Sequence, residues 1–222
     1  MADSFQSEDE QVEQLKKWWR ENGQSTVITI VLAIAGVFGW QAYQTQQQAT
    51  VDAASAIYQN LLSAAAGENG VVTSSQKATA NHLADTLKND FSGSTYAQFA
   101  ALFKAKLAVE ANDLATAEQE LTWVLAQNPT TEINLQAQLR LARVLFAQDK
   151  FDDSLALLNI DAGAYAASYE EVKGDIYLAK GDNAAAKLAY QKAVELAAQA
   201  AQPGSNPLLE IKLQQLTSEG DA

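Results

Sequence analysis

The stretch from Glu171 to Leu196, EVKGDIYLAKGDNAAAKLAYQKAVEL, decides the fold. Apolar and small residues recur in it every three or four positions, which is the spacing of one face of an α-helix. Near its middle, Gly181 suits the left-handed backbone that ends a helix, and Asn183 suits the cap that starts the next one. The stretch therefore predicts two amphipathic helices joined by a tight turn.

Two similar units precede this stretch. The earlier one is AALFKAKLAVEANDLATAEQELTWVLAQNP (residues 100–129), and the later one is QLRLARVLFAQDKFDDSLALLN (residues 138–159). A small residue is expected on the second helix of each unit, and these residues, Ala117, Ser154 and Ala186, are separated by 37 and 32 residues. The intervals bracket the period of about 34 residues of the tetratricopeptide repeat.

The last unit resembles the tetratricopeptide repeat closely. Small side chains let the paired helices approach each other, and larger side chains fill the space between consecutive pairs. One pair cannot bury its apolar face alone, so the pairs stack and the array needs caps, expected at about residues 50–66, 75–89 and 206–218. The alternative is a plain helical bundle with coincidental periodicity. The expected packing positions are Ala105, Ala117, Leu121, Pro129, Leu141, Ala142, Phe151, Ser154, Gly174, Tyr177, Gly181, Ala186, Tyr190 and Ala193.

An uncharged stretch from Asn22 to Val51 has the apolar centre TVITIVLAIAGVFGWQAY (residues 26–43). About 20 residues of helix cross the roughly 30 Å of hydrocarbon in a bilayer, so this stretch predicts one transmembrane helix. The alternatives are a cleaved signal peptide and a buried helix of a soluble domain. Basic and aromatic residues flank the apolar centre and are expected to anchor it at the membrane interfaces. These expected anchors are Lys16, Lys17, Trp18, Trp19, Arg20, Trp40 and Tyr43.

The positive charges predict the orientation. Three basic residues directly precede the apolar stretch, and the next one after it is Lys77, so the N-terminus is expected in the cytoplasm. We thus expect a cytoplasmic tail and juxtamembrane helix (1–21), a transmembrane signal-anchor helix (22–46) and a periplasmic tetratricopeptide-like domain (47–222). The polar, acidic residues 1–12 are expected to be disordered. The predicted fold class is all-α, a single N-terminal transmembrane helix followed by a helical-repeat α-solenoid.

The composition argues against several functions. The formal net charge of −12, without a basic patch, argues against nucleic-acid binding, and the absence of Cys excludes disulfides and thiolate chemistry. The only histidine, His82, is expected to be an ordinary, partly buried helix residue. The neighbouring carboxylates Asp152–Asp153 and Glu170–Glu171 are expected on the solvated surface. Without a phosphate loop, nucleophile elbow or metal-ligand spacing, we expect no enzyme, cofactor or metal site, and the concave face of the array is the expected working surface.

Several segments resemble the ancillary SecYEG translocon subunit family, and together they cover nearly the whole chain. They are EDEQVEQLKKWWRENG (residues 8–23), the pair GW that closes the apolar stretch (39–40), SAIYQN (55–60), INLQAQLRLARV (133–144) and GDIYLAKGD (174–182). The N-terminal segment is the most discriminating of these, because tetratricopeptide units occur in many unrelated proteins.

The resemblance implies a non-catalytic protein of the inner membrane of a Gram-negative bacterium, beside the SecYEG translocon. It further implies that the protein works with the periplasmic chaperone PpiD on emerging polypeptides, and that its cytoplasmic tail restrains the response regulator RcsB. Membrane lipid is a further expected partner. The alternative function is a structural envelope scaffold that organises cell-wall or division machinery through its tetratricopeptide groove.

Overall fold

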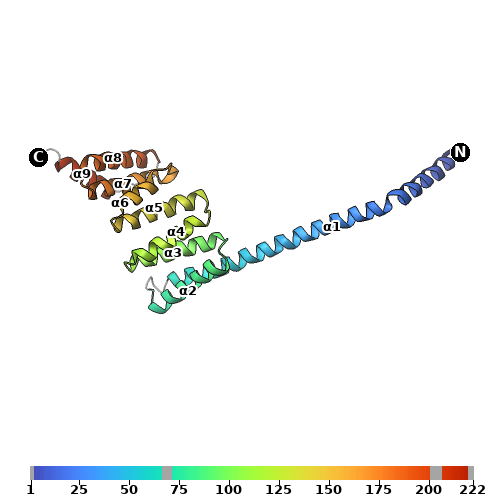
Figure 1. Cartoon of the computed structure of the whole chain (residues 1–222), viewed down its shortest axis with the longest axis horizontal. Coiled ribbons are helices and arrows are strands. Elements are labelled where there is room, and N and C mark those ends of the chain that lie inside the picture. The colour runs from blue at the N-terminus through green and yellow to red at the C-terminus, as the bar shows by residue number, and fades with distance from the viewer. Residues whose placement is uncertain (1–2, 67–71, 201–206, 220–222) are drawn as a thin grey trace. The chain divides into compact units, whose positions relative to one another are not determined.

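The computed structural model describes residues 3–66, 72–200 and 207–219, and every regular element within them is helical (Figure 1). This confirms the all-α fold class. The chain divides into two units, Met1–Ala53 and Ala54–Ala222, and we call the second the repeat domain. The elements are α1 (Asp3–Ala66), α2 (Ser74–Asp90), α3 (Thr95–Glu110), α4 (Leu114–Ala126), α5 (Thr131–Ala147), α6 (Phe151–Leu158), the 3-10 turn η1 (Gly163–Tyr165), α7 (Ala166–Ala179), α8 (Asn183–Gln199) and α9 (Pro207–Glu219).

Helix α1 is longer than the sequence analysis predicts. The expected disordered tail is wrong for residues 3–12, which are helical, and the expected cap helix at 50–66 is the end of the same helix. Met1 and Ala2 lie outside the described residues. The physical reason is cooperativity: once a helix is nucleated, each further residue adds a hydrogen bond at small cost, and no proline interrupts residues 3–66.

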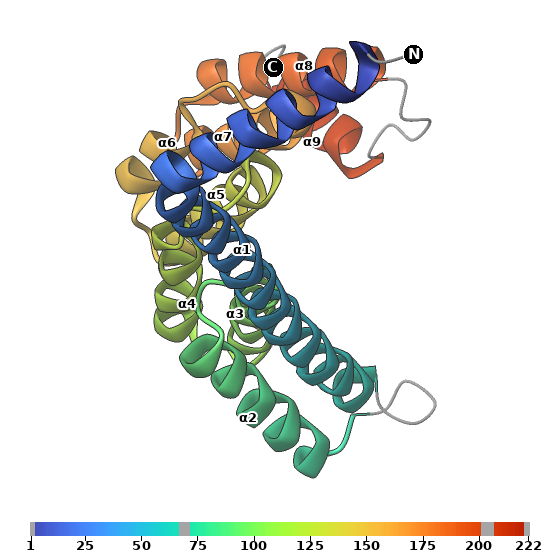
Figure 2. The same ribbon diagram turned by 90° about the vertical axis from the view of Figure 1, so that its right-hand side faces the viewer.

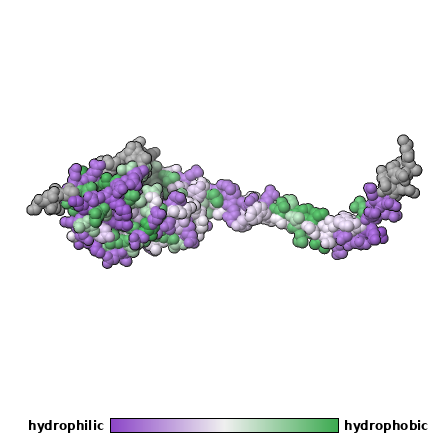
Figure 3. Space-filling view, turned by 90° about the horizontal axis from the view of Figure 1, so that it is seen from above, coloured by the Kyte–Doolittle hydropathy of each residue, from purple (hydrophilic) through white to green (hydrophobic). Residues whose placement is uncertain are grey.

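Helix α1 carries a band of exposed apolar side chains. Among the described residues it is the one helix long and apolar enough to cross a membrane, by length and composition. Eight large apolar residues between Val27 and Phe38 are each 46–67% exposed. Figure 3 shows them gathered in one band with hydrophilic residues on either side. Such a band is unfavourable in water and favourable in hydrocarbon.

The repeat domain is a stack of helical hairpins. The hairpins α3–α4, α5–α6 and α7–α8 follow one another as layers, with α2 at one end and α9 at the other (Figure 1). The core continues from layer to layer, because Trp123 packs against the apolar clusters on both sides of it and Leu157 does the same one layer further on. Figure 2 shows that the layers follow a curve, with α3 and α5 on its inner side.

The three hairpin turns share one geometry. Asn112, Asp149 and Gly181 have positive φ angles of 57°, 59° and 78°. The next residue in each turn donates its backbone N–H to the carbonyl oxygen five positions back, as Asp182 does to Tyr177 at 2.9 Å. This is the Schellman helix end, which favours Gly or Asn at the left-handed position. The prediction for Gly181 is confirmed.

The predicted helix cap at Asn183 is wrong by one residue. The carboxylate of Asp182 accepts the backbone N–H of Ala185 at 2.9 Å, so Asp182 is the N-cap of α8. Asp113 caps α4 in the same way, through the N–H of Thr116. An aspartate is one of the best capping residues, and its position directly after the left-handed residue aims its side chain at the new helix. At the far end, α9 begins at Pro207, and Asn206 lies outside the described residues.

A pair of small residues lies at the centre of each hairpin. The pairs are Ala105 with Ala117, Ala142 with Ser154, and Gly174 with Ala186; in each pair the residues are 12 positions apart and both are buried. In the middle hairpin the buried hydroxyl of Ser154 donates to the backbone oxygen of Ala142 at 2.7 Å. In the last hairpin a Cβ added to Gly174 would lie 2.4 Å from two ring atoms of Tyr190.

The other expected packing positions differ in burial. Leu121, Leu141, Tyr190 and Ala193 are buried, while Pro129, Phe151 and Tyr177 are half-buried. Gly181 is exposed, since its role is in the backbone of the turn. The ring of Phe151 packs against Phe146 with 5.9 Å between centroids.

A carboxylate is buried within the last hairpin, at a position that the sequence predicts to be solvated. Glu170 is only 9% exposed, and its carboxylate accepts from Lys173 at 3.0 Å and from Lys192 of α8 at 2.9 Å. The prediction that Glu170 and Glu171 lie on the solvated surface is therefore wrong: Glu171 is half-buried and pairs with Lys212 of α9. The reason is that Lys192 of α8 and Lys212 of α9, which pair with these groups, come from other helices, and local periodicity does not reveal them.

Glu170 makes the stability of the last hairpin dependent on pH in the acidic range. Burial alone would raise the pKa of the Glu170 carboxyl, but hydrogen bonds from Lys192 and Lys173 outweigh it and hold the pKa below its ordinary value. A carboxyl with a lowered pKa stabilises the fold above the unfolded-state pKa of about 4.3, and this contribution is lost as the pH falls through the folded-state pKa.

We expect Glu170→Gln to lower the free energy of unfolding by about 1–2 kcal/mol at pH 7 and to flatten its fall below about pH 5. Urea unfolding of the full-length chain in mild detergent, repeated from pH 7 to pH 3, measures both effects. Glu132→Gln is the matched control, because Glu132 is exposed and has no ion pair among the described residues. Equal acid dependence in wild type and Glu170→Gln would contradict this role.

Candidate partner-binding groove

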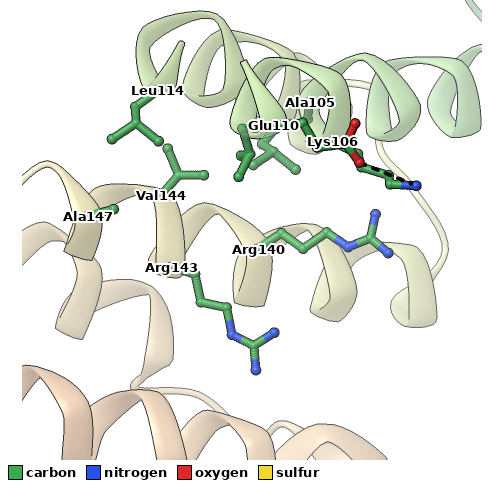
Figure 4. Close-up of a pocket in the computed structure, with 10 residues that line it drawn as sticks. Ala105, Lys106, Glu110, Leu114, Arg140, Arg143, Val144 and Ala147 are labelled. Carbon is green, nitrogen blue, oxygen red and sulfur yellow. Dashed lines mark ion pairs between the residues drawn. The ribbon is translucent and has the colours of Figure 1, made fainter. Parts of the chain in front are cut away.

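A groove of about 330 Å³ opens between α3 and α5 of the repeat domain. Helix α3 contributes one wall, α5 the other, and two leucines of α4 lie between them (Figure 4). Both α3 and α5 are first helices of their hairpins and lie on the inner side of the curve. The groove is therefore on the face that the sequence analysis expects to be the working surface.

The floor of the groove is apolar. Six side chains from the three helices form it, and the most open of the α3 residues, Val109, is 46% exposed. An apolar floor gains free energy when another apolar side chain displaces water from it. The floor residues are Ala105, Val109, Leu114, Leu121, Val144 and Ala147.

The rim of the groove is basic. Lys106 stands on the α3 side and forms an exposed ion pair with Glu110 at 3.6 Å. Arg140 and Arg143 stand one turn apart on α5, both exposed, and neither has an ion pair with a carboxylate within the described part of the chain. Figure 4 shows the two arginine side chains leaving α5 in different directions.

The protein environment works against the charge on Arg140. Crowding by neighbouring atoms lowers the pKa of its guanidinium; the nearby Tyr165 opposes this, and the like charge of Arg143 adds to it. The guanidinium stays protonated, because an arginine side chain is charged at every pH at which proteins are folded. The two positive charges therefore lie close together, and no carboxylate among the described residues pairs with either of them. An incoming carboxylate would reduce their repulsion.

The acidic end of the repeat domain is arranged differently. There Lys212 of α9 donates to Asp175 at 2.6 Å and to Glu171 at 3.3 Å, and the hydroxyl of Tyr190 donates to Asp175 at 2.7 Å. Burial and Asp175 raise the pKa of the Tyr190 phenol, which keeps it a hydrogen-bond donor. These carboxylates of α7 are thus neutralised from within the chain, whereas the two arginines of α5 have no carboxylate partner among the described residues.

The sequence analysis did not single out Lys106, Arg140 or Arg143. A signal was available, because the chain has only three arginines and two of them stand three positions apart on the first helix of the middle unit. That spacing places them on one helix face. Their meeting with Lys106 and the apolar floor depends on how the hairpins stack.

The expected interface anchors lie on α1 and are all exposed. The rings of Trp18 and Trp19 are 6.4 Å apart between centroids, and those of Trp40 and Tyr43 are 6.0 Å apart. The two ring pairs flank the apolar band, and the basic side chains Lys16, Lys17 and Arg20 lie at its N-terminal end.

The remaining polar residues considered in the sequence analysis are His82, Asp152 and Asp153. His82 is exposed on α2, so its prediction as a partly buried residue is wrong. The exposed carboxylate of Asp152 pairs with Lys180 at 2.8 Å, and Asp153 is also exposed. Over residues 3–66, 72–200 and 207–219, no three His, Asp or Glu side chains come together as a metal site would need.

Comparison with known proteins places the chain in a family. Residues 16–218 match the family described as tetratricopeptide repeat-like domain. A Haemophilus influenzae protein named ancillary SecYEG translocon subunit is 35% identical over 200 residues, which are 90% of this chain and 94% of that protein. The chain belongs to the ancillary SecYEG translocon subunit family. The resemblance found in the sequence analysis is thereby confirmed.

Other members of the ancillary SecYEG translocon subunit family match over similar lengths. The protein of that name from Aggregatibacter actinomycetemcomitans is 34% identical over 189 residues, 85% of this chain and 89% of that protein. The one from Escherichia coli (strain K12) is 27% identical over 215 residues, 96% of this chain and 98% of that protein. No solved structure matches the chain. The family relationship therefore covers both the apolar helix and the hairpin stack.

Proposed function

We propose that this protein is a non-catalytic, membrane-anchored adaptor of the SecYEG translocon that couples exported polypeptides to periplasmic chaperones. The observation that carries the proposal is the combination, in one chain, of an apolar band on α1 and a stack of hairpins with an open groove on its inner side. Hairpin stacks of this kind bind partner segments along their inner surface. The names of the relatives supply the translocon as the site of action.

The proposed arrangement has residues 1–21 in the cytoplasm, residues 22–46 in the inner membrane and residues 47–222 in the periplasm. The basic residues before the apolar band support it, since such residues stay on the cytoplasmic side. The exposed ring pairs Trp18–Trp19 and Trp40–Tyr43 fit the two headgroup regions. The further partners proposed from the family resemblance are PpiD in the periplasm, RcsB at the cytoplasmic tail, and membrane lipid.

The test is cross-linking in intact cells followed by purification of the tagged full-length chain. We expect SecY, SecE and SecG to be recovered with it, and a reporter fused after Ala222 to be active only in the periplasm. A variant with Ile34→Arg tests the anchor, because an arginine at the centre of a membrane helix costs about 2.5–3.5 kcal/mol of insertion free energy, and less SecYEG should then be recovered.

Two outcomes would refute the proposal. A cytoplasmic reporter would show that the hairpin stack is on the wrong side of the membrane to meet exported chains. Recovery of cell-wall or division proteins without SecYEG would instead favour a structural envelope scaffold. Gln14→Arg, in the proposed cytoplasmic residues 1–21, is the matched control for Ile34→Arg and should leave recovery unchanged, since basic residues there agree with the orientation.

A further inference from the structure

The groove has a basic rim in a chain that is acidic as a whole. Acidic residues outnumber Lys and Arg by 27 to 15, so a basic side chain has carboxylates in excess around it. Lysines of α2, α3, α7, α8 and α9 pair with carboxylates within 4 Å. Arg140 and Arg143 have no such partner within the described residues, although they stand side by side and repel each other. Two unpaired guanidinium groups at the edge of an apolar groove are the chemistry of an anion-recognising site.

The groove fits a carboxylate on a polypeptide better than a small ion. A small ion would leave the apolar floor formed by Val109, Val144 and their neighbours in contact with water, whereas a partner side chain would cover it. The planar guanidinium fork matches a carboxylate with two parallel hydrogen bonds. A segment with both apolar and acidic side chains is complementary to floor and rim together.

The directions of the two arginine side chains favour carboxylates of Asp or Glu side chains over a C-terminal carboxylate as the bound groups. Arg140 and Arg143 leave α5 on diverging paths, and Lys106 stands on the opposite wall (Figure 4). A single C-terminal carboxylate could meet one of the two arginines and would leave the other without a carboxylate partner among the described residues. Several Asp or Glu side chains spaced along a segment could meet all three.

We propose that the groove between α3 and α5 binds an internal segment of a partner polypeptide in which aliphatic residues are flanked by Asp or Glu. The aliphatic side chains lie on the apolar floor, and the acidic ones pair with Arg140, Arg143 and Lys106. This inference rests on the proposed adaptor function, and it adds the chemistry that selects the bound segment. Because the chain as a whole carries a charge of −12, an acidic segment is repelled elsewhere on the surface, which makes the basic rim the specific docking point.

The probe is a short end-blocked peptide, Ac-Gly-Asp-Leu-Glu-Glu-Leu-Leu-Glu-Asp-Gly-NH2, with an uncharged fluorophore. Its fluorescence anisotropy is titrated with the full-length protein in nanodiscs of phosphatidylcholine. Three counterpart peptides are titrated in the same way. In one, Asn and Gln replace the Asp and Glu residues; in another, Lys replaces them; in the third, Ser replaces the leucines. A fourth, the Asn and Gln peptide with a free C-terminal carboxylate, tests the terminal source.

We expect the acidic peptide to bind at least about tenfold more tightly than each of its counterparts, and less tightly as salt rises. The double variant Arg140→Ala/Arg143→Ala should weaken binding about tenfold, since it removes two ion pairs that are each exposed and individually weak. Lys77→Ala/Lys187→Ala removes the same charge outside the groove and should bind as wild type does. Arg140→Glu/Arg143→Glu should prefer the Lys peptide, an inversion that a loss of folding cannot produce.

The inference is overturned if the acidic and the Asn and Gln peptides bind equally, if the free terminal carboxylate restores full affinity, or if the control double variant weakens binding as much. Its failure is separable from that of the proposed function. Recovery of SecYEG with Arg140→Ala/Arg143→Ala at the wild-type level, together with equal peptide affinities, removes the inference and leaves the adaptor in place. Selective binding of the acidic peptide without recovery of SecYEG would support the inference and refute the proposed adaptor function.

Discussion

Gly174→Ala is expected to lower the free energy of unfolding of the repeat domain by about 3 kcal/mol. In an ordinary helix interior the same change stabilises by about 1 kcal/mol, because alanine loses less backbone entropy. Here the new methyl group would lie 2.4 Å from two ring carbons of Tyr190, far inside van der Waals contact. Tyr190 is fully buried, and its hydroxyl donates a hydrogen bond to Asp175, so the ring cannot move away from the new methyl group. Overpacking of this kind costs about 1–3 kcal/mol or more.

Urea unfolding of the full-length chain in mild detergent, followed by circular dichroism, measures this loss. Gly93→Ala is the control, since an added Cβ there meets no atom within 4 Å and the backbone is not left-handed. Its effect should be within about 0.5 kcal/mol. A Gly174→Ala variant as stable as wild type would show that α7 and α8 do not pack as closely as described.

A double-mutant cycle identifies the cause. Tyr190→Ala alone removes a buried ring and should cost about 3–5 kcal/mol. Combined with it, Gly174→Ala should no longer be destabilising, because the ring it collides with is gone. The two changes should therefore be non-additive by about 3 kcal/mol. Additive effects would mean that the glycine matters for a reason other than Tyr190.

The second large effect is expected at Glu120 of α4. Its side chain is 5% exposed and lies between two lysines, Lys88 of α2 and Lys104 of α3, the latter 3.0 Å away. Lys88 also lies over the ring of Trp123, with its nitrogen 5.0 Å from the centroid. The carboxylate therefore ties three helices together at the junction between the cap and the first hairpin.

Glu120→Ala should lower the free energy of unfolding by about 3 kcal/mol. Removing one partner of a buried ion pair leaves the other charge without compensation, which typically costs 3–5 kcal/mol. The cost is at the lower end because Lys104 keeps a second carboxylate, Asp85, at 2.5 Å. Lys88 is then the uncompensated group, and hydrogen exchange should show α2 opening first.

Glu118→Ala is the matched control two residues away on the same helix. Glu118 pairs with Lys150 at 2.8 Å, but both side chains are partly exposed, and such pairs contribute less than about 1 kcal/mol. Equal losses for the two variants would show that the burial of Glu120 has no energetic consequence. A loss at Glu120 that vanishes in the background of Lys88→Met would support the uncompensated charge as its cause.

The hairpins were predictable from sequence because their causes are local. Left-handed turn residues such as Gly181 and small pairs such as Gly174 with Ala186 act within about 15 residues of chain, and a helical period is visible in any window of that length. The cap of α8 was misplaced from Asp182 to Asn183, because both residue types cap well and only the direction of the chain after the turn distinguishes them.

The buried charges and the groove were not predictable in the same way. Glu170 resembles its exposed neighbours in sequence, and its burial depends on Lys192, 22 residues further along. Lys106 and Arg140 face one groove although 34 positions separate them. Whether a guanidinium is paired depends on how the helices stack. Sequence alone does not show that no carboxylate of the described helices pairs with Arg140.

The sequence alone determined the apolar helix, the number and order of the hairpins, and the residues on which each hairpin closes, since these follow from hydrogen bonding and side-chain size along a short length of chain. Only the tertiary structure decided which charges are neutralised inside the stack and which are left at the groove. That division follows from Coulomb interactions and desolvation, which depend on distances in space between groups that are far apart in sequence.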